Sequence, residues 1–391
     1  MDIQTAFAQS FNTPATILVR APGRVNLLGE HVDYNDGVVL PAAIDRAVYL
    51  AASPTTDWIV RLCALDLNKQ AAFRSDALEQ RIDLDGNPLP HWAVYPAGVA
   101  WALREAGLAV KGMQAIYTSD VPIGAGLSSS AAVEVAFAAA WRALGGWEMD
   151  NLRLAQCCQR AENGYVGVNS GLMDQFTSAC GVEGHALYFD TRSLEWHPVA
   201  LPPGTAIVVA DSGMRRTLAT SAYNDRRAAC ERAVAALQKY KPGLHSLRDI
   251  DTVEFAAYKD YLPREARLRA EHVVKEIHRV EQAVLALQRG DAPMFGGLMF
   301  SGHKSLRDLY QVSLPELDVL VELARGLPGI YGARLTGAGF GGCTVNLIAA
   351  AQAEAFIQGL QQGYRQQTGK EARVYLCHAS AGVSVEADQR G

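Results

Sequence analysis

Several features that mark common protein classes are missing from this chain of 391 residues. Its seven cysteines are odd in number and include no CxxC pair, which argues against a disulfide framework and against a cysteine zinc site. No apolar run approaches the ~18 residues that span a bilayer, and the first twelve residues carry no Lys or Arg that would begin a signal peptide. We therefore expect a cytoplasmic protein with no membrane partner.

Signatures of the best-known nucleotide-binding folds are also absent. The chain has no GxxxxGK[ST] loop and no HRD or DFG set of a protein kinase. A GxGxxG match at residues 337–342 is followed by residues 343–348, which predict a strand, whereas a dinucleotide fingerprint must open a helix. We interpret this match as a glycine hairpin that supports a nucleotide loop. The formal net charge of −5 predicts no attraction to nucleic acid.

The bulk composition is that of a folded protein with two domains. Hydrophobic residues make up 49% and charged residues 20% of the chain, whose length exceeds that of one ordinary core. Strand and helix patterns alternate in both halves without a regular βαβ repeat, which favours an α+β fold. A Leu-Pro-Pro-Gly stretch at 201–204 predicts the boundary, with an N-terminal domain over 1–200 and a C-terminal domain over 201–391.

Periodicity and turn residues predict the order of the elements. Strands are expected at 16–20, 38–44, 46–52, 58–64, 112–119, 186–190, 206–211 and 373–377. Helices are expected at 92–106, 128–144, 151–163, 172–180, 219–238, 263–288 and 351–366. Residues 21–37, between the first two strands, predict a polar loop that contains glycine.

The strongest chemical signal is the string PIGAGLSSSAA at residues 122–132. Gly124 and Gly126 allow a close approach of the backbone to a ligand and can turn several N–H groups toward one point. The predicted helix adds its unpaired N–H groups and the positive end of its dipole, a combination that suits the phosphates of ATP. Ser128 alone would be interpreted as an N-cap, but the whole string favours phosphate binding.

Two weaker signals come from polar residues. Arg24, Glu30, His31, Asp33 and Asp36 crowd the predicted loop, and such groups suit the recognition of hydroxyls. Spacing alone explains them equally well as a solvated charge cluster with a structural histidine. Elsewhere, the acid at position 174 follows an apolar Met and precedes an apolar Phe two residues on, where a carboxylate is costly unless it is paired. An ordinary aspartate on a helix surface is the alternative that these residues alone favour.

Together these strings resemble the GHMP kinases. Residues 122–132 and 335–342 are similar to motifs of the whole superfamily, whereas residues 23–37 resemble the signature of its galactokinase branch. Further similarity covers 92–95, 171–175 and 221–227. The resemblance implies a two-domain α+β fold with the active site in the cleft between the domains. It also implies transfer of the γ-phosphate of ATP, with Mg²⁺, to the C1 hydroxyl of galactose.

The resemblance further implies a role for each site residue. Asp174 would be the catalytic base, with Arg24 as its partner. The sugar would be held by Glu30, His31, Asp33, Gly171 and Tyr223. The ATP phosphates would be cradled by Gly124, Ala125, Gly126, Leu127, Ser128, Ser129 and Ser130, with Trp92 and Tyr95 beside the adenine and with Ser130 and Glu162 near Mg²⁺.

Two alternatives stay open at this point. Val32 and Ser170 stand where relatives more often have Thr and Cys, so a GHMP kinase for N-acetylgalactosamine or arabinose is one alternative. The other is a sensor of galactose and ATP that does not catalyse, although such proteins typically carry an incomplete serine loop and this loop is complete. In either case the expected partners are a small sugar and ATP, and the expected state is a monomer.

Overall fold

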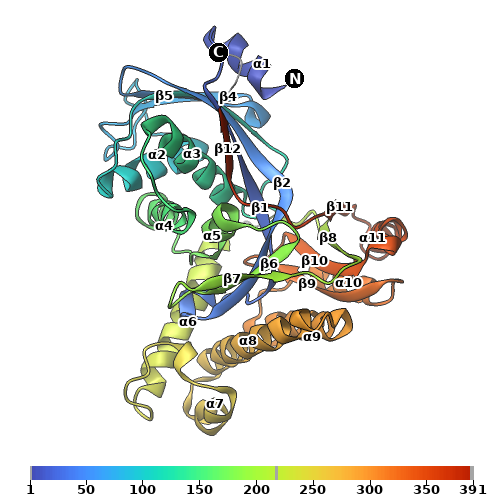
Figure 1. Ribbon diagram of the computed structural model, residues 1–391. Helices are drawn as coiled ribbons and strands as arrows, with labels where there is room; N and C mark the ends of the chain where they lie inside the picture. The colour runs from blue at the N-terminus through green and yellow to red at the C-terminus, as the bar shows by residue number, and fades with distance from the viewer. Residues whose placement is uncertain (1, 216–218, 388–391) are drawn as a thin grey trace.

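The computed structural model describes residues 2–215 and 219–387, which form two β-sheets with helices packed against them (Figure 1). The larger sheet has the strand order β12-β1-β2-β5-β3-β4, and β6 and β7 join it through β2. The smaller sheet has the order β11-β8-β10-β9. Among the described strand pairs only β3–β5 is parallel, and the helices and strands follow no regular βαβ repeat, so the predicted α+β class is confirmed.

The strands are β1 (Ile17–Leu28), β2 (Val38–Pro54), β3 (Ile59–Ala64), β4 (Lys69–Arg74), β5 (Met113–Ser119), β6 (His185–Asp190), β7 (Trp196–Ala200), β8 (Thr205–Asp211), β9 (Ile330–Thr336), β10 (Cys343–Ala349), β11 (Arg373–Cys377) and β12 (Ser384–Ala387). The main helices are α1 (Ile3–Phe11), α2 (His91–Glu105), α3 (Ser129–Gly145), α4 (Asn151–Ala161), α5 (Met173–Cys180), α6 (Ala219–Leu237), α7 (Thr252–Tyr258), α8 (Arg264–Gln288), α9 (Ala292–Ser305), α10 (Pro315–Arg325) and α11 (Ala353–Thr368). Three short turns that matter for the site are η1 (Asp33–Asn35), η3 (Glu162–Val166) and η6 (Leu306–Tyr310).

Strand β1 is longer than its sequence predicts. The expected loop from residue 21 is wrong at its start, because β1 stays paired with β2 as far as Leu28. Pro22 and Gly23 usually end strands, but here the pairing register shifts between Pro22 and Arg24, and such an irregularity lets a strand continue. The extension carries Arg24 and Asn26 into the interior, where both side chains are buried.

The larger sheet and its helices form the main hydrophobic core. Helix α3 packs on β1 and β2, and a run of buried alanines along it allows this close approach. On the same helix, the Phe137 ring contacts those of Trp141 and of Tyr117 in β5, and Trp141 Nε1–H donates to the Lys111 carbonyl at 3.1 Å. The buried position of α3 fixes where its first residues lie, and those residues reach the pocket described below.

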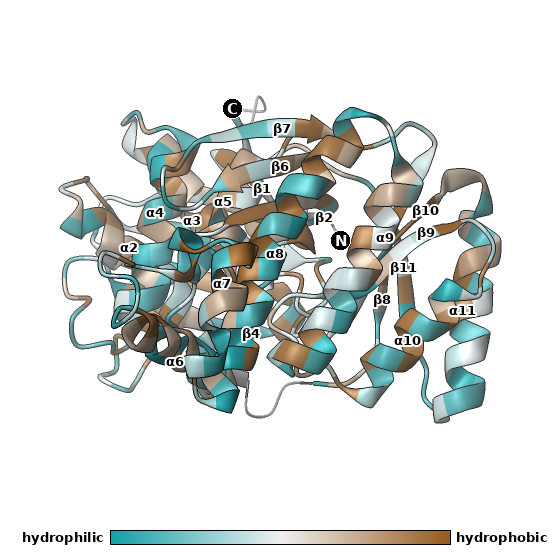
Figure 2. Cartoon of the chain, turned by 90° about the horizontal axis from the view of Figure 1, so that it is seen from below, coloured by the Kyte–Doolittle hydropathy of each residue, from teal (hydrophilic) through white to brown (hydrophobic). Residues whose placement is uncertain are grey.

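The smaller sheet is covered by helices α9, α10 and α11. Strands β8 and β10 are buried along almost their whole length. This burial fits the apolar run at 206–210 of β8, whereas β10 also buries the polar side chains of Thr344 and Asn346. Helices α10 and α11 carry both hydrophilic and hydrophobic residues (Figure 2) and bury Leu320 and Phe356 against the sheet. On α9, a side chain at Gly296 would overlap the backbone of Tyr331, so this glycine permits direct contact between the helix and β9.

The chain returns to the larger sheet after completing the smaller one. Strand β12 pairs antiparallel with the start of β1, with Ile17 opposite Ala387. The smaller sheet begins with β8 at Thr205, but the boundary at 201–204 and the two domain ranges stay predictions. Every helix of the described ranges is too short or too polar to span a membrane.

Candidate active site

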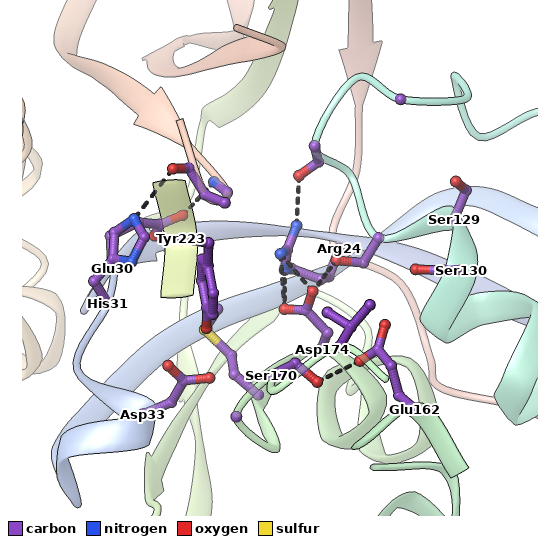
Figure 3. Close-up of a pocket in the computed structure, with 18 of the residues that line it drawn as sticks. Arg24, Glu30, His31, Asp33, Ser129, Ser130, Glu162, Ser170, Asp174 and Tyr223 are labelled. Atoms are coloured by element: carbon purple, nitrogen blue, oxygen red, sulfur yellow. Dashed lines mark hydrogen bonds and ion pairs between the residues drawn. The ribbon is translucent and has the colours of Figure 1, made fainter. Parts of the chain in front are cut away.

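A pocket of about 280 Å³ lies where β1, the start of α3, the η3–α5 segment, α6 and the β9–β10 hairpin converge (Figure 3). Its lining draws on both halves of the chain. The lining residues are Arg24, Glu30, His31, Asp33, Tyr95, Gly124, Gly126, Ser128, Ser129, Ser130, Glu162, Val168, Ser170, Gly171, Met173, Asp174, Tyr223, Gly337 and Ala338. The residues proposed for the site from the sequence that do not line this pocket are Asp36, Trp92, Ala125 and Leu127.

An arginine–aspartate pair lies at the centre of the pocket. Arg24 donates from Nε and Nη2 to the two carboxylate oxygens of Asp174, each at 2.8 Å. The Arg24 side chain is 5% exposed and that of Asp174 is 29% exposed, so the pair is mostly shielded but the carboxylate still faces the cavity. A bidentate, charge-assisted pair holds both groups in one geometry. Asp174 is therefore not an isolated aspartate on a helix surface.

The glycine–serine loop connects the end of β5 to the start of α3. Gly124, Gly126 and Ser128 have φ values of +70°, +84° and +57°, so the backbone reverses repeatedly over a few residues. Ser128 occupies the N-cap position without a side-chain capping bond, and its hydroxyl donates to Asp174 instead. The interpretation of Ser128 as only an N-cap is therefore wrong.

Contacts with β1 hold this loop in place. The Arg24 Nη1 group donates to the Gly126 carbonyl at 2.6 Å, and the Arg24 backbone N–H donates to the Leu127 carbonyl at 3.1 Å. A Cβ at Gly23 would lie 2.8 Å from that same carbonyl, so only glycine allows the contact. Ala125 and Leu127 point into the core, where they anchor the loop and leave the serines facing the pocket.

The two predicted adenine residues behave differently. Tyr95 of α2 lines the pocket. Trp92, one turn earlier, packs against the core with its ring centroid 6.2 Å from that of Tyr117. The Trp92 Nε1–H group is buried and has no hydrogen-bond partner among the described residues.

Buried acids stand behind the serine side of the pocket. Glu162 accepts hydrogen bonds from the Ser170 hydroxyl and, at 2.8 Å, from the Gln175 amide, which also donates to Glu134 at 2.9 Å. Burial raises the pKa of Glu162 and, to well above its usual value, that of Glu134. Glu134 was not predicted, although a lone charge inside the apolar run of α3 was a signal for it.

The oxygen atoms of Ser130 and Glu162 suit a magnesium ion that is also bound by a nucleotide. Within the described ranges, no group of three or more His, Cys, Asp or Glu side chains is arranged to hold a metal. Mg²⁺ commonly keeps several waters and takes one or two protein oxygens together with substrate phosphates, so no such cage is required. The hydroxyl of Ser130 and the carboxylate of Glu162 line one pocket and are ligands of the right chemistry.

A glycine and an aspartate fit closely together on the opposite side. A side chain at Gly171 would overlap the Asp33 carboxylate, so only glycine leaves that carboxylate its present position. Asp33 Oδ1 accepts the backbone N–H of Tyr34 at 3.1 Å. Burial, aided by the negative charge of Asp174, raises the pKa of Asp33 to about 6.

Glu30 is held by a buried ionic network. Its carboxylate accepts from the Gly337 backbone and the Asn26 amide and lies 3.6 Å from Arg334 Nη2. Arg334 in turn donates to Glu276 at 3.0 Å. Burial outweighs the nearby positive charges and raises the pKa of Glu30 to about 7. Neither Arg334 nor Glu276 was predicted, although Arg334 interrupts an otherwise apolar strand.

His31 is held between ring systems and a carbonyl. Its φ of +63° is uncommon for a residue with a side chain and turns the ring toward the pocket wall. The ring centroid lies 5.5 Å from that of Tyr223, and Nε2 is 3.2 Å from the Ala338 carbonyl oxygen. Glu30, His31, Asp33 and Tyr223 lie on one side of the cavity, with Arg24 and Asp174 between them and Ser129 and Ser130 (Figure 3). Gly171, the fifth residue predicted to hold a sugar, also lines the pocket and lies against Asp33.

Comparisons with known proteins agree with this geometry. Residues 5–54 match the model of the galactokinase galactose-binding signature, residues 94–182 that of the GHMP kinases N terminal domain, and residues 283–366 that of the GHMP kinases C terminal domain. A galactokinase of Roseiflexus sp. (strain RS-1) is 48% identical over 98% of this chain and 96% of its own length.

More distant relatives preserve the whole length. A galactokinase of Homo sapiens is 42% identical over 98% of this chain and 96% of its own. The crystal structure of Lactococcus lactis galactokinase complexed with galactose superimposes with a TM-score of 0.92 at 33% identity, covering 97% of this chain and 98% of that one. The two-domain GHMP kinase fold expected from the sequence is thereby confirmed. The chain belongs to the galactokinase family of the GHMP kinases.

Proposed function

We propose that this chain transfers the γ-phosphate of ATP to the C1 hydroxyl of galactose, giving galactose 1-phosphate and ADP. The observation that supports this most strongly is the position of the Arg24–Asp174 pair, between the serine loop and the acids Glu30 and Asp33 (Figure 3). A base at that position can reach both a sugar hydroxyl on one side and a phosphate on the other. Galactokinases of similar sequence and fold agree with this substrate.

In the proposed reaction, Asp174 accepts the proton of the C1 hydroxyl as the sugar oxygen attacks the γ-phosphorus. The new O–P bond forms while the bond to the β–γ bridging oxygen breaks, and ADP leaves with that electron pair. Arg24 orients the carboxylate through two hydrogen bonds and stabilises charge on the sugar oxygen. Most of the barrier reduction in phosphoryl transfer comes from such positioning and charge stabilisation.

The loop from Gly124 to Ser130 would donate backbone N–H groups and hydroxyls to the phosphate oxygens. Ser130 and Glu162 would hold Mg²⁺, which supplies neutralisation of phosphate charge when bound. We also propose a cytoplasmic enzyme, a location that agrees with the seven cysteines, none of which forms a disulfide. We further propose that it acts as a monomer.

The test is ADP release from Mg-ATP across a panel of galactose, glucose, N-acetylgalactosamine, arabinose and mevalonate. We expect release with galactose and a product phosphorylated at C1. In Asp174→Asn, turnover should fall on the order of 10²–10⁴-fold while galactose still binds. Asp76→Asn is the matched control, because Asp76 also forms a bidentate pair, with Arg74, on the exposed surface. Turnover near normal in Asp174→Asn would refute the base assignment.

Other outcomes of the panel would change the proposal in defined ways. Release with a different sugar would keep the mechanism and change the substrate. Binding of galactose and ATP without any release of ADP would identify a sensor instead of an enzyme.

A further inference from the structure

Behind His31, a line of hydroxyl groups runs away from the pocket into the core. The Tyr34 hydroxyl lies 2.7 Å from His31 Nδ1, and the Tyr310 hydroxyl lies 2.7 Å from that of Tyr34. The Cys230 sulfur completes the line at 3.4 Å from the Tyr310 oxygen. Cys230 comes from α6, Tyr310 from η6 and Tyr34 from η1, so three distant segments meet at this point.

The carbonyl at the other side of His31 sets the direction of this line. The Ala338 carbonyl can only accept, so His31 Nε2, 3.2 Å away, carries the hydrogen. In a neutral imidazole the other nitrogen, Nδ1, is then an acceptor, and the Tyr34 hydroxyl donates to it. Tyr310 therefore donates to Tyr34, and the Cys230 thiol donates to Tyr310. Each group uses its one hydrogen on its neighbour.

The line is buried and packed in place. Tyr310 is 0% and Cys230 is 1% exposed. The Tyr310 ring lies 4.7 Å from that of His31 and 4.5 Å from that of His272, and the Tyr310 carbonyl accepts from Arg226 Nε at 2.9 Å. Burial raises the pKa of Tyr310 well above its usual value, so its hydroxyl keeps the proton that it donates. The ring cannot turn away without leaving polar groups unpaired.

The pocket lining does not include Tyr34, Tyr310 or Cys230. It does include His31 and Ala338, the two residues at the end of this hydrogen-bonded line. We propose that Cys230, Tyr310 and Tyr34 are positioning residues for sugar binding, which fix the tautomer and orientation of His31 and, through its Nε2–H group, the Ala338 carbonyl. The proposal rests on the proposed function, because it assigns the sugar side of the same pocket.

A positioning role for these residues can be distinguished from a purely structural one by its effect on sugar binding. Without the Tyr34 hydroxyl, His31 can move its hydrogen to Nδ1, and Nε2 would then face the Ala338 carbonyl with a lone pair. Loss of the Tyr310 hydroxyl removes only the donor to Tyr34. Loss of the Cys230 thiol removes only the donor to Tyr310, which is one residue further from His31. Positioning through the line therefore predicts an effect on sugar binding that is graded from Tyr34 to Cys230.

The experiment compares Tyr34→Phe, Tyr310→Phe and Cys230→Ala with Tyr364→Phe. Tyr364 is the matched control, because it is fully buried and donates to the Ser212 carbonyl at 2.9 Å within the second half of the chain. For galactose, we expect KM to rise about tenfold in Tyr34→Phe and about threefold in Tyr310→Phe, and by less in Cys230→Ala. The kcat and the KM for ATP should stay within about twofold in all of them.

Selective ¹⁵N NMR of the histidine rings provides an independent readout. The His31 signals, assigned by their loss in His31→Asn, should show an Nε2–H tautomer in the unmodified chain and a changed Nδ1 signal in Tyr34→Phe. An unchanged galactose KM and unchanged His31 signals in Tyr34→Phe, or an equal rise of KM in Tyr364→Phe, would overturn the proposal. If the unmodified chain releases no ADP with galactose, the proposed function fails, and the tautomer of His31 still decides whether the line acts on it.

Discussion

The two walls of the pocket are built in different ways. The phosphate wall, residues 124–130, is one continuous segment that presents backbone groups and hydroxyls. The sugar wall consists of Glu30, His31, Asp33, Gly171 and Tyr223, and it is held from behind by residues that are far away in the sequence. Glu30, for example, accepts from Gly337, 307 positions further along the chain. A local string can specify the first wall, but only the complete fold can assemble the second.

The walls also differ in how they carry charge. The phosphate wall offers N–H groups and the positive end of a helix dipole, and these interact favourably with a negatively charged ligand. Behind the sugar wall, Arg334 and Glu276 are both 0% exposed and depend on one another. Burial alone would raise the pKa of Glu276, but the charges of Arg279 and Arg334 outweigh it and lower that pKa to about 2. The second wall should therefore be the more sensitive to loss of a single side chain.

The largest effect on this comparison should come from Arg334→Met. The change leaves Glu30 and Glu276 buried without this cation, and breaking a buried pair costs about 3–5 kcal/mol. Thermal and urea unfolding should show a marked loss of stability. Arg365→Met is the control, because the Arg365–Glu371 pair is exposed and contributes at most about 1 kcal/mol. Equal losses in both variants would remove the distinction between the walls.

The next effect concerns Gly171→Ala. The added methyl group would displace the Asp33 carboxylate, so galactose affinity should fall about 10- to 100-fold while the KM for ATP hardly changes. Calorimetric titration measures the affinity for galactose, and steady-state kinetics measure the KM for ATP. Gly297→Ala in α9 is the control, because its Cβ meets no atom within 4 Å. Unaltered galactose binding in Gly171→Ala would show that Asp33 does not need its present position.

Ser130→Ala addresses the phosphate wall alone. Loss of one hydroxyl beside charged phosphates should raise the KM for Mg-ATP about tenfold and leave galactose affinity unchanged. Kinetics at saturating galactose measure the KM for Mg-ATP, and calorimetry without ATP measures the affinity for galactose. A similar loss on both substrates would mean that the walls are not independent.

The smallest effect should be the pH dependence of galactose binding without ATP. Asp33 has a raised pKa of about 6, so it is ionised above that pH and becomes protonated as the pH falls through it. An ionised carboxylate accepts from hydroxyls better, and the Asp33 component of the affinity should therefore fall about three- to fourfold between pH 8 and pH 5.5. Asp33→Asn should retain only the component from Glu30, whose pKa is about 7. A flat profile in the unmodified chain would contradict this role.

Much of the fold could be predicted wherever periodicity was strong. Helices expected at 92–106 and 263–288 correspond to α2 and α8, and the hairpin around the glycines of 337–342 is present. Helix α9 was missed because its glycines have low helix propensity, and it forms because Gly296 packs on β9. The predicted strand ended too early for a similar reason. Pairing of β1 with β2 overrides the local preference of Pro22 and Gly23 to end a strand.

The same division applies to the site. The serine loop, Arg24 and Asp174 could be proposed from local strings and a family resemblance, and they line one pocket. The supporting residues Glu134, Arg334 and Tyr310 could not, because their partners are distant in sequence and no spacing marks them. Two of them nevertheless left a trace, as charged residues within apolar runs.

The pairing of β12 with β1 has a consequence for synthesis on the ribosome. Strands β1 and β2 are complete by residue 54, but their edge partner extends to residue 387. At bacterial or eukaryotic elongation speeds of ~5–20 residues per second, that partner follows roughly 15–70 s later. For this interval β1 exposes an unpaired edge, a template on which another nascent chain can add a strand. The speed of translation thus sets how long the growing protein stays open to aggregation.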